Sequence, residues 1–455
     1  MVDSLIAYRI NKLNLFLFIA LSLLTAFFTF NKSGERYDIV VLGIFFLISV
    51  FSLFGTLISI DTKSYSLNKS FCLFFYFFFS LAPIVQFKNK TIFFLKDYLT
   101  TEIYLTTACI LLIILLLYLV FYNVMFKYLK RKEYVIHNLK FNSKFSYKNH
   151  LKVSYILAIF SVLIVLYLMK WEMSLLIFRP FSYGLKNNTN LGLFGYSLLL
   201  IFRLIPFIVL LNYKIGKEKN DRNTFFFLLI VLLICFPTSM SRGLVAIIYI
   251  PLVILFFPLF KRGINYVLLF IIGVLFVFPL FNNFRYLKEG ILKLNFELFN
   301  SAHFDAFQNM ALVINENIIT SGKQLVGSFL FFVQESQWPN KPNGSGHLLG
   351  ETVGYSYLNV SMPYFGEGYV NWGYLGIFFF LLFIVLINTI GDSLSKKGSN
   401  FILFVILYLL FLGFEFYLMR GDLYSSIKIF SSFLLAVVVV YFTFLINSKL
   451  VNKIN

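Results

Sequence analysis

Long apolar segments recur along almost the whole chain and are separated by short polar breaks. Crossing a hydrocarbon core of about 30 Å takes about 20 helical residues, which is close to the length of most of these segments. Backbone groups in lipid must be hydrogen-bonded internally, so such segments predict helices and not open strands. The pattern predicts an all-α, polytopic membrane protein with about 12 transmembrane helices, near residues 13–30, 39–60, 70–87, 103–126, 151–171, 191–212, 224–240, 243–260, 264–283, 367–391, 400–419 and 427–447.

The third segment, "FCLFFYFFFSLAPIVQF", is short and contains Pro83. We keep it as a helix, because dropping it would move every later loop to the opposite side of the membrane. Composition agrees with a membrane protein, since 59% of the residues are hydrophobic and only 13% are charged. Soluble domains carry about twice that share of charged residues.

The distribution of Lys and Arg predicts the orientation. The stretch 127–152 is rich in both, and short basic loops are retained in the cytoplasm. With 12 helices, the same face receives the other basic loops and both termini, so we expect a multi-pass protein of the cytoplasmic (inner) membrane with both termini in the cytoplasm. The net charge of +19 then reflects topology signals and contacts with membrane lipids, which argues against a nucleic-acid partner.

The chain divides into three parts on this interpretation. Residues 1–283 hold helices 1 to 9 and the basic cytoplasmic loop 127–152, and residues 367–455 hold helices 10 to 12. Between them, residues 284–366 form a long extracytoplasmic loop, amphipathic in its first half and rich in Trp, Gly and Pro in its second. Long loops of this kind are commonly functional, so we expect short helices that cap an active site.

Metal and disulfide chemistry is not indicated. The three cysteines, Cys72, Cys109 and Cys235, all lie inside expected helices, and the chain has only four histidines. We therefore expect no metal site and no cofactor.

Three arginines fall where an expected helix meets the outer face: Arg242 in "TSMSRG", Arg285 in "NNFRYLKEG" and Arg420 in "FYLMRGDLY". One interpretation is that each arginine only anchors its helix at the lipid headgroups. The other is a shared anion site, because planar guanidinium groups bind phosphate oxygens bidentately and stay charged near lipid.

These segments also carry a family resemblance. The "SRGLVAI" helix start, the "FR" that leaves a later helix, and the run "QWPNKPNG" followed by "GEGYVNWGYLGIFFF" resemble the Wzy-type O-antigen and exopolysaccharide repeat-unit polymerases. The resemblance is specific between about Arg242 and Arg420. It implies a glycosyltransferase of lipopolysaccharide or related polysaccharide synthesis, which moves a growing glycan from one polyprenyl diphosphate onto the sugar of another lipid-linked repeat unit. It also implies a partner protein that controls chain length.

Such a transfer requires cations at the leaving diphosphate. The candidates are Arg242, Arg285 and Arg420, with Lys341 of "WPNKP" as a fourth.

The acceptor hydroxyl requires a base, for which Glu367, Asp305 and His303 are the candidates. Glu367 is preferred, because it lies at the outer start of the tenth helix between Gly366 and Gly368, which allow close backbone approach. The rings that could stack on sugars are Trp338, Tyr364 and Trp372.

Two functions remain as alternatives, a lipid-linked glycan transporter (flippase) and an O-antigen ligase-like transferase. Two charges lie within expected helices, Arg203 and Glu415. Ionisable groups in such positions usually face the protein interior, where they pair or line a path. For Glu415 the expected partner is one of the outer arginines.

Overall fold

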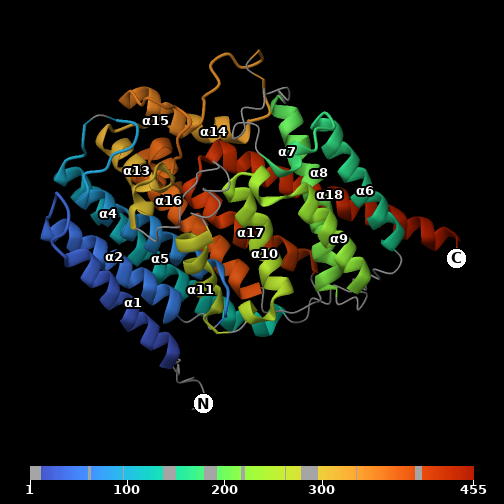
Figure 1. The fold of residues 1–455 in the computed structure, drawn as a ribbon, viewed down its shortest axis with the longest axis horizontal. Helices are drawn as coiled ribbons and strands as arrows, with labels where there is room; N and C mark the ends of the chain where they lie inside the picture. The colour runs from blue at the N-terminus through green and yellow to red at the C-terminus, as the bar shows by residue number, and fades with distance from the viewer. Residues whose placement is uncertain are drawn as a thin grey trace.

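The computed structural model describes residues 12–59, 63–95, 97–136, 150–178, 192–216, 221–261, 263–277, 296–334, 336–394 and 402–454. These residues form helices joined by loops, with no strand among them, and the helices pack side by side in one bundle (Figure 1). Arg285 and residues 137–149 of the expected basic loop lie outside the described residues.

Ten helices of the described chain are long and apolar enough to cross a membrane. Two further apolar helices, α10 (Arg242–Phe256) and α11 (Asn265–Ile272), are shorter. Every expected segment therefore contains a helix, which confirms the all-α fold and is compatible with a multi-pass membrane protein, but the number of 12 spans is not confirmed. The ten are α1 (Lys12–Phe30), α2 (Ile39–Leu57), the continuous helix of α3 (Leu67–Tyr76), η1 (Phe77–Leu81) and α4 (Ala82–Lys88), α5 (Thr101–Ile136), α6 (Leu151–Leu168), α8 (Leu193–Ile215), α9 (Asp221–Ile234), α16 (Tyr364–Leu394), α17 (Ile402–Arg420) and α18 (Leu423–Ile454).

The proline-containing third segment is a helix and lies almost wholly inside the bundle. Pro83 falls in the first turn of α4, directly after the π-helical turn η1. A change in hydrogen-bond spacing accommodates the missing N–H of a proline, so the helix continues through it. At its start, the Asp392 carboxylate of α16 accepts hydrogen bonds from the backbone N–H groups of Leu67 and Asn68, both 3.0 Å.

Helix α5 continues well beyond the expected span 103–126 and ends at Ile136. Lysine and arginine are good helix formers, so a basic segment that follows an apolar helix can extend it. The first part of the expected loop 127–152 is therefore helical.

Helices α10 and α17 form a closely packed antiparallel pair near the middle of the bundle (Figure 1). A Cβ atom at Gly243, near the start of α10, would collide with the ring of Tyr417, near the end of α17. One turn further along α10, Ile247 lies against Gly413. The pair has therefore no room for larger side chains at these glycines, and the start of α10 lies beside the end of α17.

Short helices gather at this same end of the bundle, between α11 and α16 in the sequence. In Figure 1, α13, α14 and α15 lie together along the upper edge. The short helices described between α11 and α16 are η7 (Phe296–Asn300), η8 (Ala302–Phe304), α13 (Ala306–Asn315), α14 (Lys323–Phe329) and α15 (Ser345–Val353).

Helix α16 is a hairpin of two helical arms. The backbone leaves helical geometry at Trp372 (φ −146°, ψ 26°) and at Gly373 (φ 62°, ψ −142°), and the second of these conformations favours glycine. The Tyr364 hydroxyl donates to the carbonyl of Phe380 at 3.1 Å, whereas a straight helix would separate these residues by about 24 Å. Residues 364–371 thus fold back along the arm that begins at residue 374.

This hairpin corrects the expected place of Glu367, which lies in the short arm and not at the outer start of a continuous transmembrane helix. The two arms touch through their glycines, because a Cβ atom at Gly376 would collide with the carbonyl oxygen of Gly368. A glycine next to Glu367 does serve close backbone approach, as expected, but the partner is the second arm of the same hairpin.

Candidate functional site

Arg242 and Arg420 lie at the same end of the α10–α17 pair, since one is the first residue of α10 and the other the last residue of α17. Arg420 is favoured there by the negative end of its helix dipole, but Arg242 adds a positive charge to the positive end of α10. Helix stability therefore does not explain Arg242. A helix N-terminus that already carries an arginine is instead suited to binding an anion.

Only some of the hydrogen-bond donors of Arg420 are used within the described structure. Its Nη2 donates to Asp305 Oδ1 at 3.0 Å and to the carbonyl of Ala302 at 3.3 Å. Its Nε has no hydrogen-bond partner in the described structure, and the side chain keeps 34% of its surface exposed. The guanidinium thus pairs with one carboxylate and retains donors for a second acceptor.

Asp305 holds together three segments around Arg420. Besides the arginine, Oδ1 accepts from the Ser361 hydroxyl at 2.6 Å, and Oδ2 accepts from the Asn309 amide at 3.2 Å. The Tyr355 hydroxyl donates in turn to the side-chain oxygen Oδ1 of Asn309 at 2.9 Å. His303, half-buried, lies two residues before Asp305 and next to the carbonyl of Ala302 that Arg420 contacts.

Glu367 is buried, with 1% of its surface exposed, and its partners are neutral. Oε2 accepts from the Ser345 hydroxyl at 2.6 Å, at the start of α15, and Oε1 accepts from the backbone N–H of Leu423 at 2.7 Å, at the start of α18. The ion pairs of the described residues do not include this carboxylate. Glu367 therefore joins the short arm of α16 to two other helix starts.

Asp422 is a further carboxylate at this end of the bundle, half-buried, and it was not among the residues proposed from the sequence. Oδ1 accepts from the Tyr424 N–H at 2.8 Å and caps α18, while Oδ2 accepts from the Gly346 N–H at 2.9 Å. Burial raises the pKa of Asp422, and the backbone N–H donors oppose this effect. An Asp directly before an apolar helix is an N-cap signal, so "MRGDLY" did carry a mark of this role.

Lys341 is fully engaged by the protein. Its Nζ donates to the carbonyls of Phe331 at 2.7 Å and Val333 at 2.9 Å, and to the Tyr424 hydroxyl at 3.3 Å. An ammonium has three protons, so these contacts occupy all of them. The lysine fastens its own loop to the start of α18 and is not left available for a diphosphate.

The three candidate sugar platforms differ in exposure. Tyr364 is buried inside the α16 hairpin, where its ring packs on Phe365 and Phe380, so it offers no open face. Trp338 is half-buried in the loop that Lys341 fastens. Trp372, at the hairpin turn, is 41% exposed with its indole against Gly322. Of the three, Trp372 is the most exposed.

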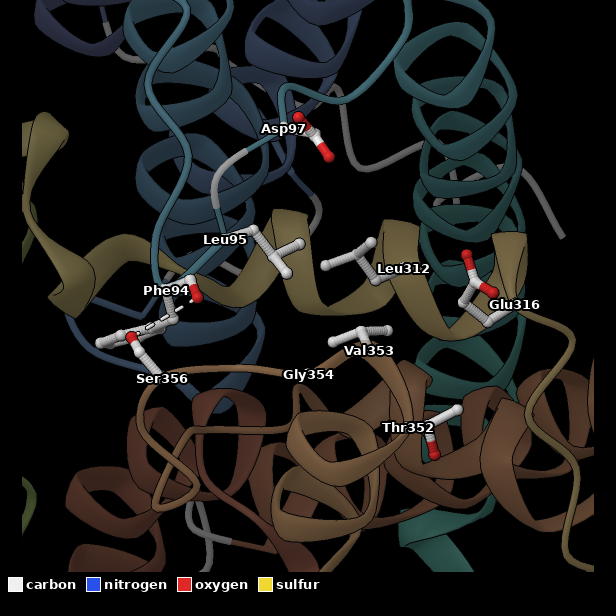
Figure 2. Close-up of a pocket in the computed structure, with 9 residues that line it drawn as sticks. All are labelled: Phe94, Leu95, Asp97, Leu312, Glu316, Thr352, Val353, Gly354 and Ser356. Carbon is white, nitrogen blue, oxygen red and sulfur yellow. Dashed lines mark hydrogen bonds between the residues drawn. The ribbon is translucent and has the colours of Figure 1, made fainter.

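A cavity of about 850 Å³ opens at the far ends of α13 and α15 (Figure 2). Helix α13 begins beside Asp305 and α15 begins at Ser345, so the cavity is about 15 Å from the carboxylates. Acidic groups at its edge disfavour a phosphate, and none of the residues proposed from the sequence lines it. The lining residues are Phe94, Leu95, Asp97, Leu312, Glu316, Thr352, Val353, Gly354 and Ser356.

The structure thus brings Arg242, Arg420, Asp305 and Glu367 to one end of the bundle, together with Asp422. Comparisons with models of protein families, with curated proteins and with solved structures gave no match. In the described residues, no group of His, Cys, Asp or Glu side chains is arranged to hold a metal ion. What this end of the bundle offers a ligand is fixed guanidinium cations beside buried carboxylates.

The expected pairing of Glu415 with an arginine is wrong for the described residues. Glu415 lies deeper in α17, and its Oε1 accepts from the Asn388 amide at 2.7 Å. The same amide donates to the Tyr118 hydroxyl at 3.0 Å. This is a polar contact between α5, α16 and α17 inside the bundle, separate from the outer carboxylates.

Proposed function

We propose that this protein is a glycosyltransferase of the cytoplasmic membrane, a polymerase that joins polyprenyl-diphosphate-linked oligosaccharide repeat units. The observation that carries the proposal is the position of Arg242 and Arg420 at one end of a close helix pair, next to Asp305 and Glu367. Cations and carboxylates in this combination suit a reaction in which an anion leaves and a hydroxyl loses a proton. The sequence resemblance to repeat-unit polymerases supports the same reaction.

In the proposed reaction, a hydroxyl oxygen of the acceptor sugar attacks the anomeric carbon of the donor glycan. The bond between that carbon and the diphosphate oxygen breaks, and the diphosphate leaves with the electron pair. Arg242 and Arg420 stabilise the charge that develops on it, and a carboxylate takes the hydroxyl proton. The products are a longer lipid-linked glycan and a free polyprenyl diphosphate.

Glu367 remains the preferred base over Asp305. Asp305 would have to leave the Arg420 guanidinium to accept a proton, whereas the hydrogen-bond donors to Glu367 are neutral, the Ser345 hydroxyl and the Leu423 N–H, and the Asp422 carboxyl lies nearby. Displacing a neutral donor from a carboxylate costs less than displacing a cation. An acceptor hydroxyl could take the place of the Ser345 hydroxyl at Oε2.

The proposed orientation puts the arginine end outside and both termini in the cytoplasm. It predicts that a cysteine at Asn340, which is exposed on the loop fastened by Lys341, reacts with a membrane-impermeant thiol reagent added to whole cells. A cysteine at Lys130, exposed near the end of α5, should react only after the membrane is opened. Replacing the half-buried Cys109 by alanine removes background labelling. Labelling of position 130 from outside would invert the topology.

The function itself is tested with the purified chain in vesicles that contain polyprenyl-diphosphate-linked repeat units. We expect longer lipid-linked glycans and one free polyprenyl diphosphate for each bond formed. The chain-length regulator implied by the resemblance is not needed to form a bond, so it is omitted. Movement of repeat units across the vesicle membrane without growth would indicate a flippase. Transfer only onto a lipid A core acceptor would indicate a ligase.

A further inference from the structure

Arg203 is a buried cation without a counterion in the described structure. It lies in α8 with 5% of its surface exposed, and its Nε has no hydrogen-bond partner. The Tyr196 and Cys235 side chains lie near it, and the described ion pairs do not include it. Burying a guanidinium without an anion is unfavourable, and none of the described acidic side chains pairs with it, so an anionic ligand bound here would stabilise the buried charge.

A second cation lies close by. Lys428, half-buried in α18, places its Nζ 4.7 Å from the centre of the Tyr196 ring. Helices α8 and α18 pack along one another (Figure 1), so Arg203 and Lys428 approach the same tyrosine from neighbouring helices. The described ion pairs give Lys428 no acidic partner either. Two cations therefore share this place in the bundle.

These cations lie deeper than the outer arginines. The Cys235 thiol donates to the carbonyl of Arg203, and the carbonyl of Cys235 accepts from the Tyr249 hydroxyl at 3.0 Å. Tyr249 is two turns along α10 from Arg242, which is about 10 Å. Along α8, Arg203 lies two turns, about 10 Å, beyond Tyr196, which is near the start of that helix.

Tyr417 lies between the outer arginines and the tyrosine near Arg203 and Lys428. Tyr417 packs on Gly243 and lies within electrostatic reach of Tyr196, Arg420 and Asp422. Polar side chains thus continue from the outer arginines to Tyr196 and from there to Arg203 and Lys428. The deeper cations belong to the same region of the molecule as the proposed reaction centre.

We propose that Arg203 and Lys428 form a second phosphate site, which holds the diphosphate of the acceptor lipid. This rests on the proposed function, since joining two repeat units requires two lipid diphosphates at once. The leaving diphosphate belongs to the donor and needs the cations beside the carboxylates, Arg242 and Arg420. The reacting hydroxyl of the acceptor belongs to a sugar and not to its diphosphate, so the acceptor lipid must be anchored away from the carboxylates. The deeper cation pair meets that requirement.

The melting temperature of an Arg203→Met variant distinguishes a structural role of Arg203 from a ligand-binding role, because the two roles predict changes of opposite sign. Replacing Arg203 by methionine, of similar length, removes a lone buried charge and should raise the melting temperature of the ligand-free protein. An arginine that stabilises the bundle by packing would instead lower the melting temperature when replaced. Lys214→Met, in the same helix, is the matched control and should change the melting temperature little, because Lys214 lies over the Phe256 ring and near Lys261 and forms none of the ion pairs of the described residues.

Binding is measured by titrating the purified full chain in detergent with farnesyl diphosphate. We expect two binding steps and a rise in melting temperature, and neither effect with farnesol, which lacks the diphosphate. Arg203→Met should weaken one step by about 30-fold or more, and Arg242→Ala should weaken the other. Lys428→Gln should weaken the same step as Arg203→Met, and it serves as the second variant if Arg203→Met does not fold.

Unchanged binding of farnesyl diphosphate in both Arg203→Met and Lys428→Gln would overturn the second site. Equal stabilisation by phosphatidylglycerol, lost in the same variants, would also overturn it, because the cations would then hold an ordinary phospholipid. If the protein shows both binding steps for farnesyl diphosphate but forms no glycan bonds in vesicles, the proposed function is overturned and the second phosphate site stands.

Discussion

Replacing Arg242 by lysine should shorten the glycan product nearly as severely as replacing it by alanine. Lysine keeps the charge but offers a point cation in place of a planar fork, so it cannot reproduce bidentate phosphate contacts. Loss of one charge-assisted contact, roughly 2–3 kcal/mol at the transition state, slows turnover by about 30- to 150-fold. The product should fall from a long ladder to one or a few repeats.

The position of Arg242 sharpens this prediction. Its charge lies at the unfavourable end of the α10 dipole, so removing the charge relieves an unfavourable interaction with that dipole. Glycan chain length is compared in cells with equal, membrane-inserted amounts of each variant. Arg36→Lys is the matched control: Arg36 donates to the Leu99 carbonyl and lies over the Phe87 ring, away from the α10–α17 pair. A normal ladder from Arg242→Lys would leave Arg242 as a membrane anchor.

Glu367→Gln should abolish polymer while the protein still folds and inserts. Glutamine can keep its oxygen toward the Leu423 N–H and turn its amide toward the Ser345 hydroxyl, which can accept as well as donate. The contacts that join the α16 hairpin to α15 and α18 therefore survive, and only the proton acceptor is lost. Removal of a general base typically costs about 10²- to 10⁴-fold in rate.

The rate of chain growth in vesicles, together with the melting temperature, measures this effect. Glu351→Gln is the control, because Glu351 lies exposed on α15 with only His347 as an ionic partner, at 3.4 Å. Near-normal growth with Glu367→Gln would exclude Glu367 as the base and move the role to Asp305 or His303. A large fall in melting temperature would show instead that the carboxylate is structural.

Glycines at the arginine end permit the close contacts that position its charged side chains. Gly243, Gly368 and Gly376 each lie where a Cβ atom would collide with a neighbouring helix or its side chain. The close contacts bring Arg242 beside the end of α17 and hold the arm that carries Glu367. Small residues at helix contacts in membranes permit such approach. They are hard to interpret from the sequence, because a glycine signals a close contact without naming the partner.

The sequence alone determined the helices and the ends at which charge accumulates. Lipid leaves helices as the solution for long apolar segments, so α1, α2 and α17 follow from hydrophobicity and length. The same logic located Arg242 and Arg420 at helix ends, because a polar break marks each end. The number of spans was less determined, since α10 and α11 are apolar but short.

Tertiary structure alone decided what each charged or aromatic side chain touches. The sequence does not reveal that Lys341 donates hydrogen bonds within its own loop, that Tyr364 is buried in a hairpin, or that Asp422 joins α15 to α18. Nor does the sequence show that Glu415 accepts a hydrogen bond from Asn388, or that Arg203 pairs with none of the described acidic side chains. The physical reason is that hydrophobic periodicity reflects neighbours within one helix, whereas these contacts join separate segments, from 10 residues apart for Lys341 and Phe331 to 76 for Asp422 and Gly346.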